Sequence, residues 1–171
     1  MLEVKMVAEE KYRPTYANDT DARMDIKAKI VNNKPRQAWF EDYKFGVMRN
    51  TESMETENSI VLLPKEIRKI HTGLQVSVPI GYEMNMVVRS SVGIKKNLML
   101  ANGTGIIDAG YRDEIIMCLV NYGNEPVIIN DGDRICQFAI LKVNKVNPEF
   151  VQDDENFRQG DRGGGIGSSG V

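Results

Sequence analysis

Apolar and polar side chains alternate along the segment Tyr82-Glu83-Met84-Asn85-Met86-Val87-Val88. In an extended chain they would therefore point to opposite sides. A two-residue period is typical of a β-strand with one buried face, so Met84 and Met86 are expected to pack in the core or in an interface. Similar runs recur along the chain, at Leu2–Val7, Met24–Val31, Ser59–Leu63, Ile67–Val78, Glu114–Asn121, Pro126–Ile129 and Arg134–Val143. Turn-forming residues separate them. The sequence therefore predicts an all-β protein, a sandwich or barrel of the jelly-roll kind.

Length and charge exclude several classes of function. A chain of 171 residues suits one domain, and a net charge of −2 provides no basic field for nucleic acid. No apolar run is long enough to span a bilayer, and the first residues do not resemble a signal peptide. Cys118 and Cys136 lie in apolar runs, as expected of free thiols in a reducing cytoplasm. We expect a cytoplasmic protein without membrane or nucleic-acid partners.

The single histidine, His71, argues against a zinc site or a histidine-based catalytic triad, and we expect it to be an ordinary strand residue. A metal acting here should be a hard ion such as Mg²⁺, brought by a phosphorylated ligand.

Two segments break the strand pattern. The insertion 33–58 is rich in aromatic residues, and Pro35 could begin a short helix with Trp39, Tyr43 and Val47 on one face. After Pro148 the chain turns acidic and then glycine-rich, which is typical of a flexible arm. The expected organisation is a β-barrel domain over 1–148, which includes the insertion, and an arm over 149–171.

Chemistry-bearing residues gather in three places. The run Gly103–Arg112 combines glycines, apolar residues and one carboxylate, Asp108, which suits either a hairpin pocket or an ordinary turn. Arg89-Ser90-Ser91 follows a strand, and an arginine with two hydroxyls can hold phosphate oxygens. The terminal run that starts at Arg162 offers another arginine, backbone N–H groups and hydroxyls for an anion.

The order of these pieces resembles the trimeric dUTPases, of the phage or prophage type. The motifs are Ala22-Arg23-Met24-Asp25-Ile26, Arg89-Ser90-Ser91, Gly105-Ile106-Ile107-Asp108-Ala109-Gly110-Tyr111, Gly132-Asp133-Arg134-Ile135-Cys136-Gln137 and the terminal run from Arg162 to Gly170. The resemblance covers nearly the whole chain except the insertion 33–58. It implies a homotrimer whose C-terminal arm is exchanged between subunits.

The resemblance also implies the activity, which is Mg²⁺-dependent hydrolysis of dUTP to dUMP and pyrophosphate. Asp108 would activate the water that attacks the α-phosphorus, and Asp25 would be structural or reach Mg²⁺ through water. The resemblance implies that uracil and deoxyribose contact Asn102, Gly105, Ile106, Ile107, Ile116 and Tyr111. It implies that the phosphates contact Arg89, Ser90, Ser91 and Gln137. The arm would contribute Arg162, Ile166, Gly167, Ser168 and Ser169.

The chain departs from the family pattern at a few positions. Arg23 and Met24 replace the usual glycine and tyrosine, and Ile166 replaces an aromatic residue that stacks on uracil. An isoleucine has no π-face, so another aromatic such as Phe157 or Trp39 would have to supply the stacking.

Two other functions are alternatives to dUTP hydrolysis. A dCTP deaminase would share the fold, but it needs a glutamate where this chain has Cys118, and Glu114 comes four positions too early. The alternative from another class is a regulatory protein that binds a repressor through the aromatic residues of the insertion 33–58. Those aromatic residues could instead pack the insertion onto the trimer.

Overall fold

The computed structural model describes residues 2–42, 44, 47–51, 54–155 and 157–160. A short 3₁₀ helix, η1 (Glu10–Tyr12), and one seven-residue helix, α1 (Ser90–Lys96), accompany the strands. The strands are β1 (Lys5–Val7), β2 (Met24–Lys27), β3 (Trp39–Asp42), β4 (Val47–Asn50), β5 (Ser59–Leu62), β6 (Ile67–Ile70), β7 (Gln75–Ser77), β8 (Tyr82–Val88), β9 (Leu98–Leu100), β10 (Gly105–Asp108), β11 (Met117–Asn121), β12 (Val127–Asn130) and β13 (Arg134–Lys142). The prediction of an all-β chain is confirmed.

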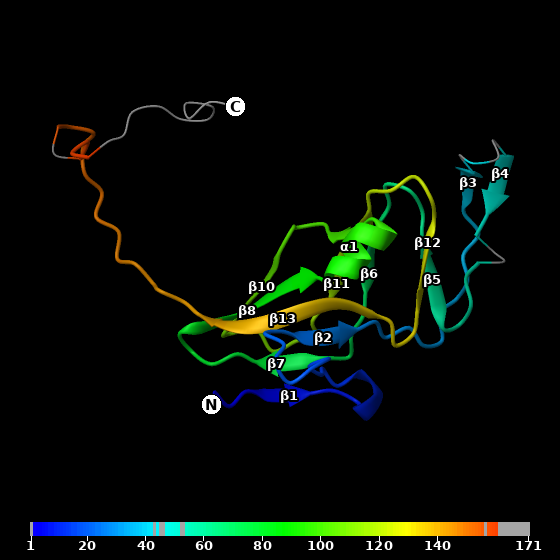
Figure 1. The fold of residues 1–171 in the computed structure, drawn as a ribbon, viewed down its shortest axis with the longest axis horizontal. Helices are drawn as coiled ribbons and strands as arrows, with labels where there is room; N and C mark the ends of the chain where they lie inside the picture. The colour runs from blue at the N-terminus through cyan, green and yellow to red at the C-terminus, as the bar shows by residue number, and fades with distance from the viewer. Residues whose placement is uncertain (1, 43, 45–46, 52–53, 156, 161–171) are drawn as a thin grey trace.

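A four-stranded antiparallel sheet in the order β10-β8-β13-β2 carries most of the predicted functional residues. A three-stranded sheet, β6-β11-β9, and the pairs β1-β7 and β12-β5 complete the barrel. In Figure 1 the β3–β4 pair stands at one end of the barrel, and the C-terminal segment leaves from the other.

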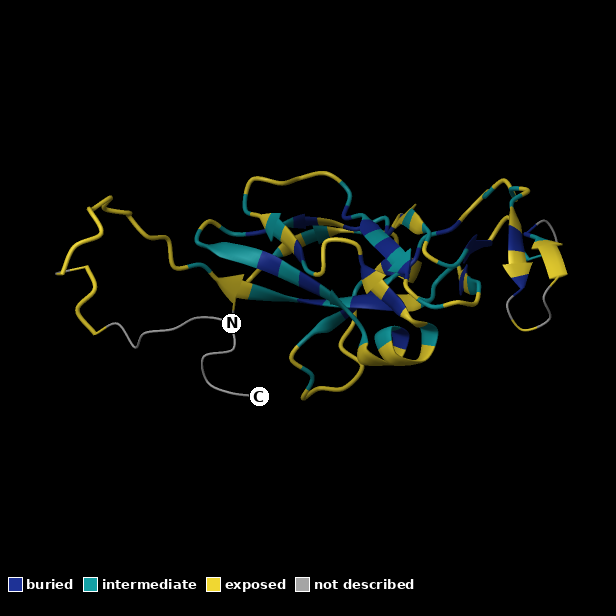
Figure 2. Cartoon of the chain, turned by 90° about the horizontal axis from the view of Figure 1, so that it is seen from above, coloured by how far each residue is buried: buried dark blue, intermediate teal, exposed yellow. Residues whose placement is uncertain are grey.

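Apolar side chains from all these sheets meet in one core. Met84 and Met86 of β8 are buried, as their alternation predicts, and Phe138 of β13 lies directly opposite Met86. Figure 2 shows buried and more exposed residues alternating along the strands of the barrel. The inward face of the central sheet thus belongs to the core, and its outward face is free for polar residues.

The predicted strand Ile67–Val78 is wrong in one respect, because it is divided into β6 and β7. Gly73 adopts a φ of 65°, which turns the chain between the two strands. His71 therefore lies just after β6, in the connecting segment, and not within a strand. The strands β9 and β10 and the helix α1 were not expected from the alternation pattern.

The helix predicted in the insertion is also wrong. Trp39–Asp42 pairs with Val47–Asn50 as a two-stranded antiparallel sheet, with Trp39 opposite Asn50. Phe40 and Asp42 are buried while Trp39 and Glu41 are exposed, so the segment follows a strand period. Tyr43, the remaining aromatic of the predicted helical face, lies outside the described residues.

The base of the insertion is fixed to the barrel by Glu55. Its buried carboxylate accepts hydrogen bonds from the backbone N–H groups of Val61 and Arg36, at 2.9 Å each, and pairs with Arg68 Nη1 at 2.6 Å. Although burial opposes ionisation, these donors hold the pKa of Glu55 below its ordinary value.

The segment that follows the barrel is exposed. Residues 144–155 form no strand or helix, and they extend away from the barrel in Figures 1 and 2. The glycine-rich end, 161–171, lies outside the described residues. Within the described part of the chain, no helix is both long and apolar enough to cross a bilayer.

Candidate active site

A pocket of about 250 Å³ opens beside the edge strand β10. Its lining is mostly apolar and consists of Met86, Leu100, Asn102, Gly105, Ile106, Ile107, Asp108, Tyr111, Ile115, Ile116 and Cys118. Within that lining Asp108 supplies the one carboxylate. The pocket therefore brings together the uracil and sugar contacts predicted from sequence and the predicted catalytic group.

The backbone of β10 is positioned by two glycines. Gly103, with a φ of 72°, turns the chain between β9 and β10. A Cβ on Gly105 would lie only 2.7 Å from Met86 Cε, so this glycine leaves room for the Met86 side chain, which lines the same pocket. Because β10 pairs on one side only among the described strands, its other edge can offer N–H and C=O groups to a flat polar ligand.

A tight turn follows Asp108 and fixes Tyr111. The backbone N–H of Tyr111 donates to the carbonyl of Asp108 at 3.1 Å, and the Tyr111 hydroxyl donates to the carbonyl of Glu114 at 2.8 Å. Arg112 Nη1 donates to the carbonyls of Ala109 and Tyr111 at 2.6 and 2.7 Å, which closes the turn. The tyrosine ring is thus held at the pocket from both ends.

Asp108 itself is exposed at the rim of the pocket and is not enclosed by a hairpin. No donor among the described residues forms a hydrogen bond with its carboxylate. Its oxygens are therefore accessible to water and to a ligand in the pocket.

Glu114 anchors the same turn to the loop between β6 and β7. Its carboxylate accepts hydrogen bonds from the N–H groups of Thr72 at 3.0 Å and Gly73 at 2.6 Å, and it lies 2.9 Å from His71 Nδ1. Burial opposes ionisation of this carboxyl, but these three partners together hold its pKa below the ordinary value. These contacts engage the Glu114 carboxylate in holding the loop, so it is not available as the proton shuttle that a deaminase would need.

A second cluster forms on the outward face of the central sheet, around Asp25. Asp25 Oδ1 lies 2.9 Å from Arg89 Nε, and its Oδ2 lies 3.1 Å from Arg134 Nη1. The carboxylate is buried between the two guanidinium groups, so both of its oxygens are already engaged. This geometry fits a carboxylate that positions arginines.

The remaining phosphate candidates lie next to this cluster. Ser90 and Ser91 are exposed in the first turn of α1, immediately after β8. Gln137 of β13 is directly opposite Asp25, so the two side chains share one face of the sheet.

The pocket and the cluster around Asp25 are separated within one chain. Asp108 is paired with Glu83, and Arg89 comes six residues after Glu83, beyond the other end of β8. At about 3.4 Å per residue, the two positions are roughly 20 Å apart along the strand. Within a single chain, Asp108 and Arg89 therefore lie beyond opposite ends of the same strand.

Comparison with known sequences agrees with this site. A family model described as dUTPase matches residues 54–170. The chain belongs to the dUTPase family. A deoxyuridine 5'-triphosphate nucleotidohydrolase from Desulfitobacterium hafniense is 40% identical over 116 residues, which is 67% of this chain and 76% of that relative. One from Ehrlichia canis is 34% identical over 156 residues, covering 90% of this chain and 99% of the relative.

Solved dUTPase structures share the fold. A mutant dUTPase of Staphylococcus bacteriophage 80alpha superposes with a TM-score of 0.72 at 23% identity, and the match covers 100% of each chain. The dUTPase family model begins its match only at residue 54, so almost all of the insertion 33–58 precedes the matched region.

Several predicted site residues of this dUTPase lie outside the described residues, namely Arg162, Ile166, Gly167, Ser168 and Ser169. The sequence reasoning also missed two groups. Arg134 shares the carboxylate of Asp25, and Glu114 holds the turn that carries Tyr111. Arg134 lies within the motif Gly132–Gln137, which was the available signal, whereas Glu114 follows the motif that ends at Tyr111 and was considered only as a deaminase residue.

Proposed function

We propose that the chain hydrolyses dUTP to dUMP and pyrophosphate and that Asp108 activates the water that attacks the α-phosphorus. The observation that carries this proposal is the pocket beside β10, with one accessible carboxylate at its rim and Tyr111 next to it. A positioned carboxylate can remove a proton from water during attack. The curated relatives named as dUTP nucleotidohydrolases support the same reaction.

In this proposal the edge of β10 that does not pair with β8 binds the uracil ring. Backbone groups of Gly105, Ile106 and Ile107, with Asn102 and Ile116, would contact its polar edge, and close packing of β10 around the ring would exclude a thymine methyl group. Tyr111 packs on the deoxyribose and excludes a 2′-hydroxyl. The hydrogen bond of its hydroxyl to Glu114 supports this role because it restricts the ring to one place.

The phosphate chain would contact Arg89, Ser90, Ser91 and Gln137, with the arm residues Arg162, Ile166, Gly167, Ser168 and Ser169 closing over it. Arginine can bind phosphate oxygens through two parallel hydrogen bonds. The contact with Asp25 fixes the Arg89 guanidinium before substrate arrives. Most of the catalytic effect would therefore come from positioning and charge neutralisation.

Mg²⁺ fits this scheme as a companion of the substrate. Among the described residues, no three His, Cys, Asp or Glu side chains gather into a metal-binding group, and Asp25 already pairs with two arginines. Phosphate oxygens are ligands that Mg²⁺ prefers, so the ion would arrive on the triphosphate and neutralise part of its charge. A solved dUTPase of phage phi11 of S. aureus coordinates a structural Mg(II) ion.

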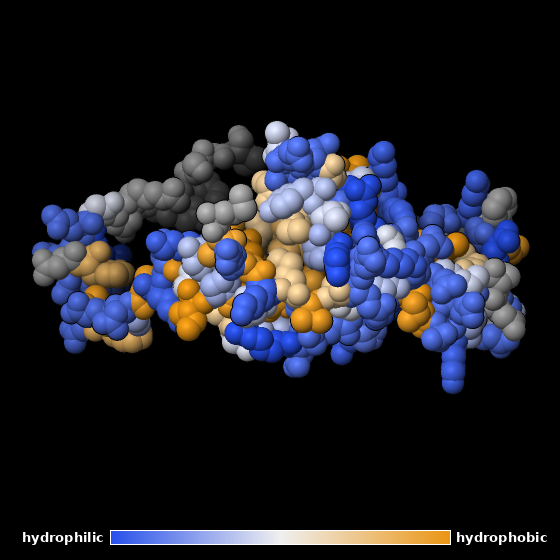
Figure 3. Space-filling view, turned by 90° about the horizontal axis from the view of Figure 1, so that it is seen from below, coloured by the Kyte–Doolittle hydropathy of each residue, from blue (hydrophilic) through white to orange (hydrophobic). Residues whose placement is uncertain are grey.

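The roughly 20 Å between Asp108 and Arg89 supports a homotrimer in which different subunits complete each site. Figure 3 shows apolar side chains gathered over the middle of one face of the barrel, as expected of a face covered by another subunit. Phe150, in the segment after the barrel, is 94% exposed and would gain a partner by exchange of the arm. Free thiols at Cys118 and Cys136 are consistent with a reducing cytoplasm.

The test is pyrophosphate release from dUTP, dCTP, dTTP and UTP at fixed Mg²⁺. We expect turnover of dUTP alone, and a loss of about 10²–10⁴-fold in kcat for Asp108→Asn, the range that a general base supplies. Asp113→Asn is a matched control because Asp113 is exposed in the same loop. Ammonia release from dCTP, or full activity of Asp108→Asn, would overturn the assignment.

The insertion supports a second function, the binding of a repressor protein. Trp39 is 63% exposed, and a hollow of about 670 Å³ beside it is lined by Trp39, Phe40, Asp42, Met48, Arg49, Asn50, Met54, Glu125 and Pro126. Exposed aromatic residues often anchor protein partners. Solved phage dUTPases of similar fold are described as controlling transfer of virulence genes by a G protein-like mechanism.

The structure defines a deletion that tests this second function. Thr51 N–H donates to the carbonyl of Ala38 at 3.0 Å, so a two-glycine linker can replace residues 39–50 while Glu55 keeps its contacts. We expect hydrolysis of dUTP to persist and binding of a candidate repressor to be lost. Repressor binding that survives the deletion would rule out the insertion as the contact.

A further inference from the structure

Arg23 departs from the family pattern, and the structure gives its side chain a defined place. Its Nη1 donates to the backbone carbonyl of Asn85 at 2.8 Å and to Asn85 Oδ1 at 3.2 Å. Both acceptors are neutral, and no described carboxylate forms an ion pair with Arg23. Within the described part of the chain, neutral groups alone therefore hold this half-buried guanidinium in place.

The position of Arg23 follows from the register of the central sheet. Asp25 is opposite Gln137, and Gln137 is opposite Val87, so these three residues form one row on the outward face. Arg23 comes two residues before Asp25, and it reaches Asn85, two residues before Val87. Its guanidinium therefore lies one row along the same face, roughly 7 Å from the row of Gln137.

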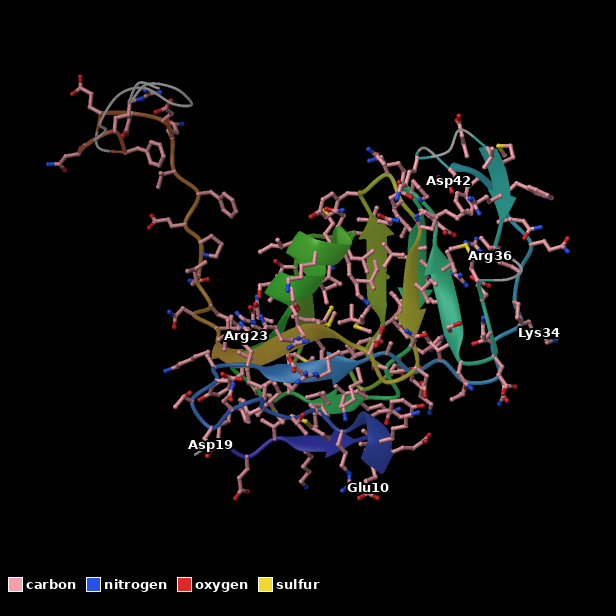
Figure 4. The ribbon with its side chains drawn as sticks, turned by 45° about the vertical axis from the view of Figure 1, so that its right-hand side comes forward. Glu10, Asp19, Arg23, Lys34, Arg36 and Asp42 are labelled. Atoms are coloured by element: carbon pink, nitrogen blue, oxygen red, sulfur yellow. The ribbon has the colours of Figure 1, made fainter. Side chains whose placement is uncertain are left out.

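Arg89 approaches this row from the opposite side. Its Nε lies 2.9 Å from Asp25 Oδ1, while its own backbone follows the end of β8. Gln137 thus lies between two arginines, one paired with Asp25 and one unpaired. Figure 4 shows Arg23 beside β13 and β2 on the side of the barrel away from the insertion.

From this juxtaposition we infer that Arg23 is a phosphate-binding residue, which adds a positive charge to the face that receives the triphosphate of dUTP. The inference rests on the proposed function. A triphosphate carries several negative charges, and a guanidinium fixed by neutral acceptors still has N–H donors to give. Glu83 lies one row further along β8, and no described ion pair joins its carboxylate to Arg23.

The experiment compares Arg23→Gln with the wild type. We expect the KM for dUTP to rise about tenfold with a smaller change in kcat, because the lost contact binds phosphate in the ground state as well. Inhibition by deoxyuridine, which has no phosphate, should stay within about twofold, and Arg23→Lys should recover much of the affinity. A weaker dependence of KM on salt concentration should accompany the substitution.

Lys34→Gln is the matched control. It also removes one positive charge, and Figure 4 places Lys34 at the insertion end, on the opposite side of the molecule from Arg23. An unchanged KM in Arg23→Gln would overturn the inference. An equal loss of dUTP and deoxyuridine affinity would overturn it too, because a general structural effect would then explain both.

Binding of a non-hydrolysable dUTP analogue, measured by calorimetry, separates this inference from the proposed reaction. If the wild type binds the analogue but does not hydrolyse dUTP, the proposed function fails while the Arg23 comparison still holds. If hydrolysis is normal and Arg23→Gln binds the analogue as tightly as the wild type, only the Arg23 inference fails.

Discussion

Replacing Asp25 with asparagine tests whether this carboxylate positions Arg89. The substitution keeps the size of the side chain but turns one oxygen into an NH₂ group, which faces a guanidinium donor. Removing one partner of a fully buried ion pair costs about 3–5 kcal/mol, and an exposed pair contributes about 1 kcal/mol or less. The Asp25 side chain is 5% exposed, while Arg89 and Arg134 are 25% and 46% exposed, so water can replace part of the contact.

We therefore expect a loss of about 2 kcal/mol in the free energy of unfolding, between those two limits. For a chain of this length that corresponds to a fall of about 4–8 °C in Tm, measured at one protein concentration. Release of Arg89 should also lower kcat/KM for dUTP by about tenfold, or 1.4 kcal/mol. The Mg²⁺ concentration that gives half-maximal activity should not change.

The opposite pattern would refute this reasoning. If Asp25 holds Mg²⁺ through water, Asp25→Asn will keep the wild-type Tm and raise the Mg²⁺ requirement. Glu9→Gln is the control, because it also removes one carboxylate charge from an ion pair, here with Lys29 at 2.5 Å, but Glu9 is 68% exposed. We expect that control to cost about 1 kcal/mol or less.

Two further predictions concern titratable groups. The pKa of Glu114 is lowered in the folded state, so its contribution to stability is present above about pH 4.5 and is lost as the pH falls through the lowered value. In urea unfolding, the loss of stability toward acid pH should be shallower in Glu114→Gln than in the wild type, and the slope that remains comes from other carboxyls such as Glu55. Burial raises the pKa of Cys136 to about 12, so iodoacetamide at about pH 8 should leave Cys136 unmodified and label Cys118, which lines the pocket. Mass spectrometry of the peptides would detect both labels, deoxyuridine should slow labelling of Cys118, and faster labelling of Cys136 would contradict the burial argument.

The sequence predicted what depends on short-range pattern. The alternation around Met84 and Met86 reports which side of a strand is buried, and both side chains lie in the core. Composition singled out the run Gly103–Arg112 but left a pocket and an ordinary turn open, and the structure shows a pocket there. The family model confirms the resemblance to the dUTPases that the order of the motifs indicated.

The insertion shows where pattern failed. Trp39, Tyr43 and Val47 fit a helical period, yet Trp39–Asp42 is a strand. Helix and strand are nearly equal in local preference over so short an aromatic run, and pairing with Val47–Asn50 decided between them. Gly73 similarly divided a long strand, because Glu114, distant in sequence, binds the N–H groups of the turn.

By itself, then, the sequence determined the all-β class, the identity of the chemical groups and the family, since these follow from residue types and their order. Only the tertiary structure decided which groups act together. It placed Asp25 between Arg89 and Arg134, bound Glu114 to His71, and put Arg23 beside the row of Gln137. It also set Asp108 roughly 20 Å from Arg89, at opposite ends of β8. Those contacts join residues far apart along the chain, and their geometry is fixed by strand register and packing, which local sequence does not encode.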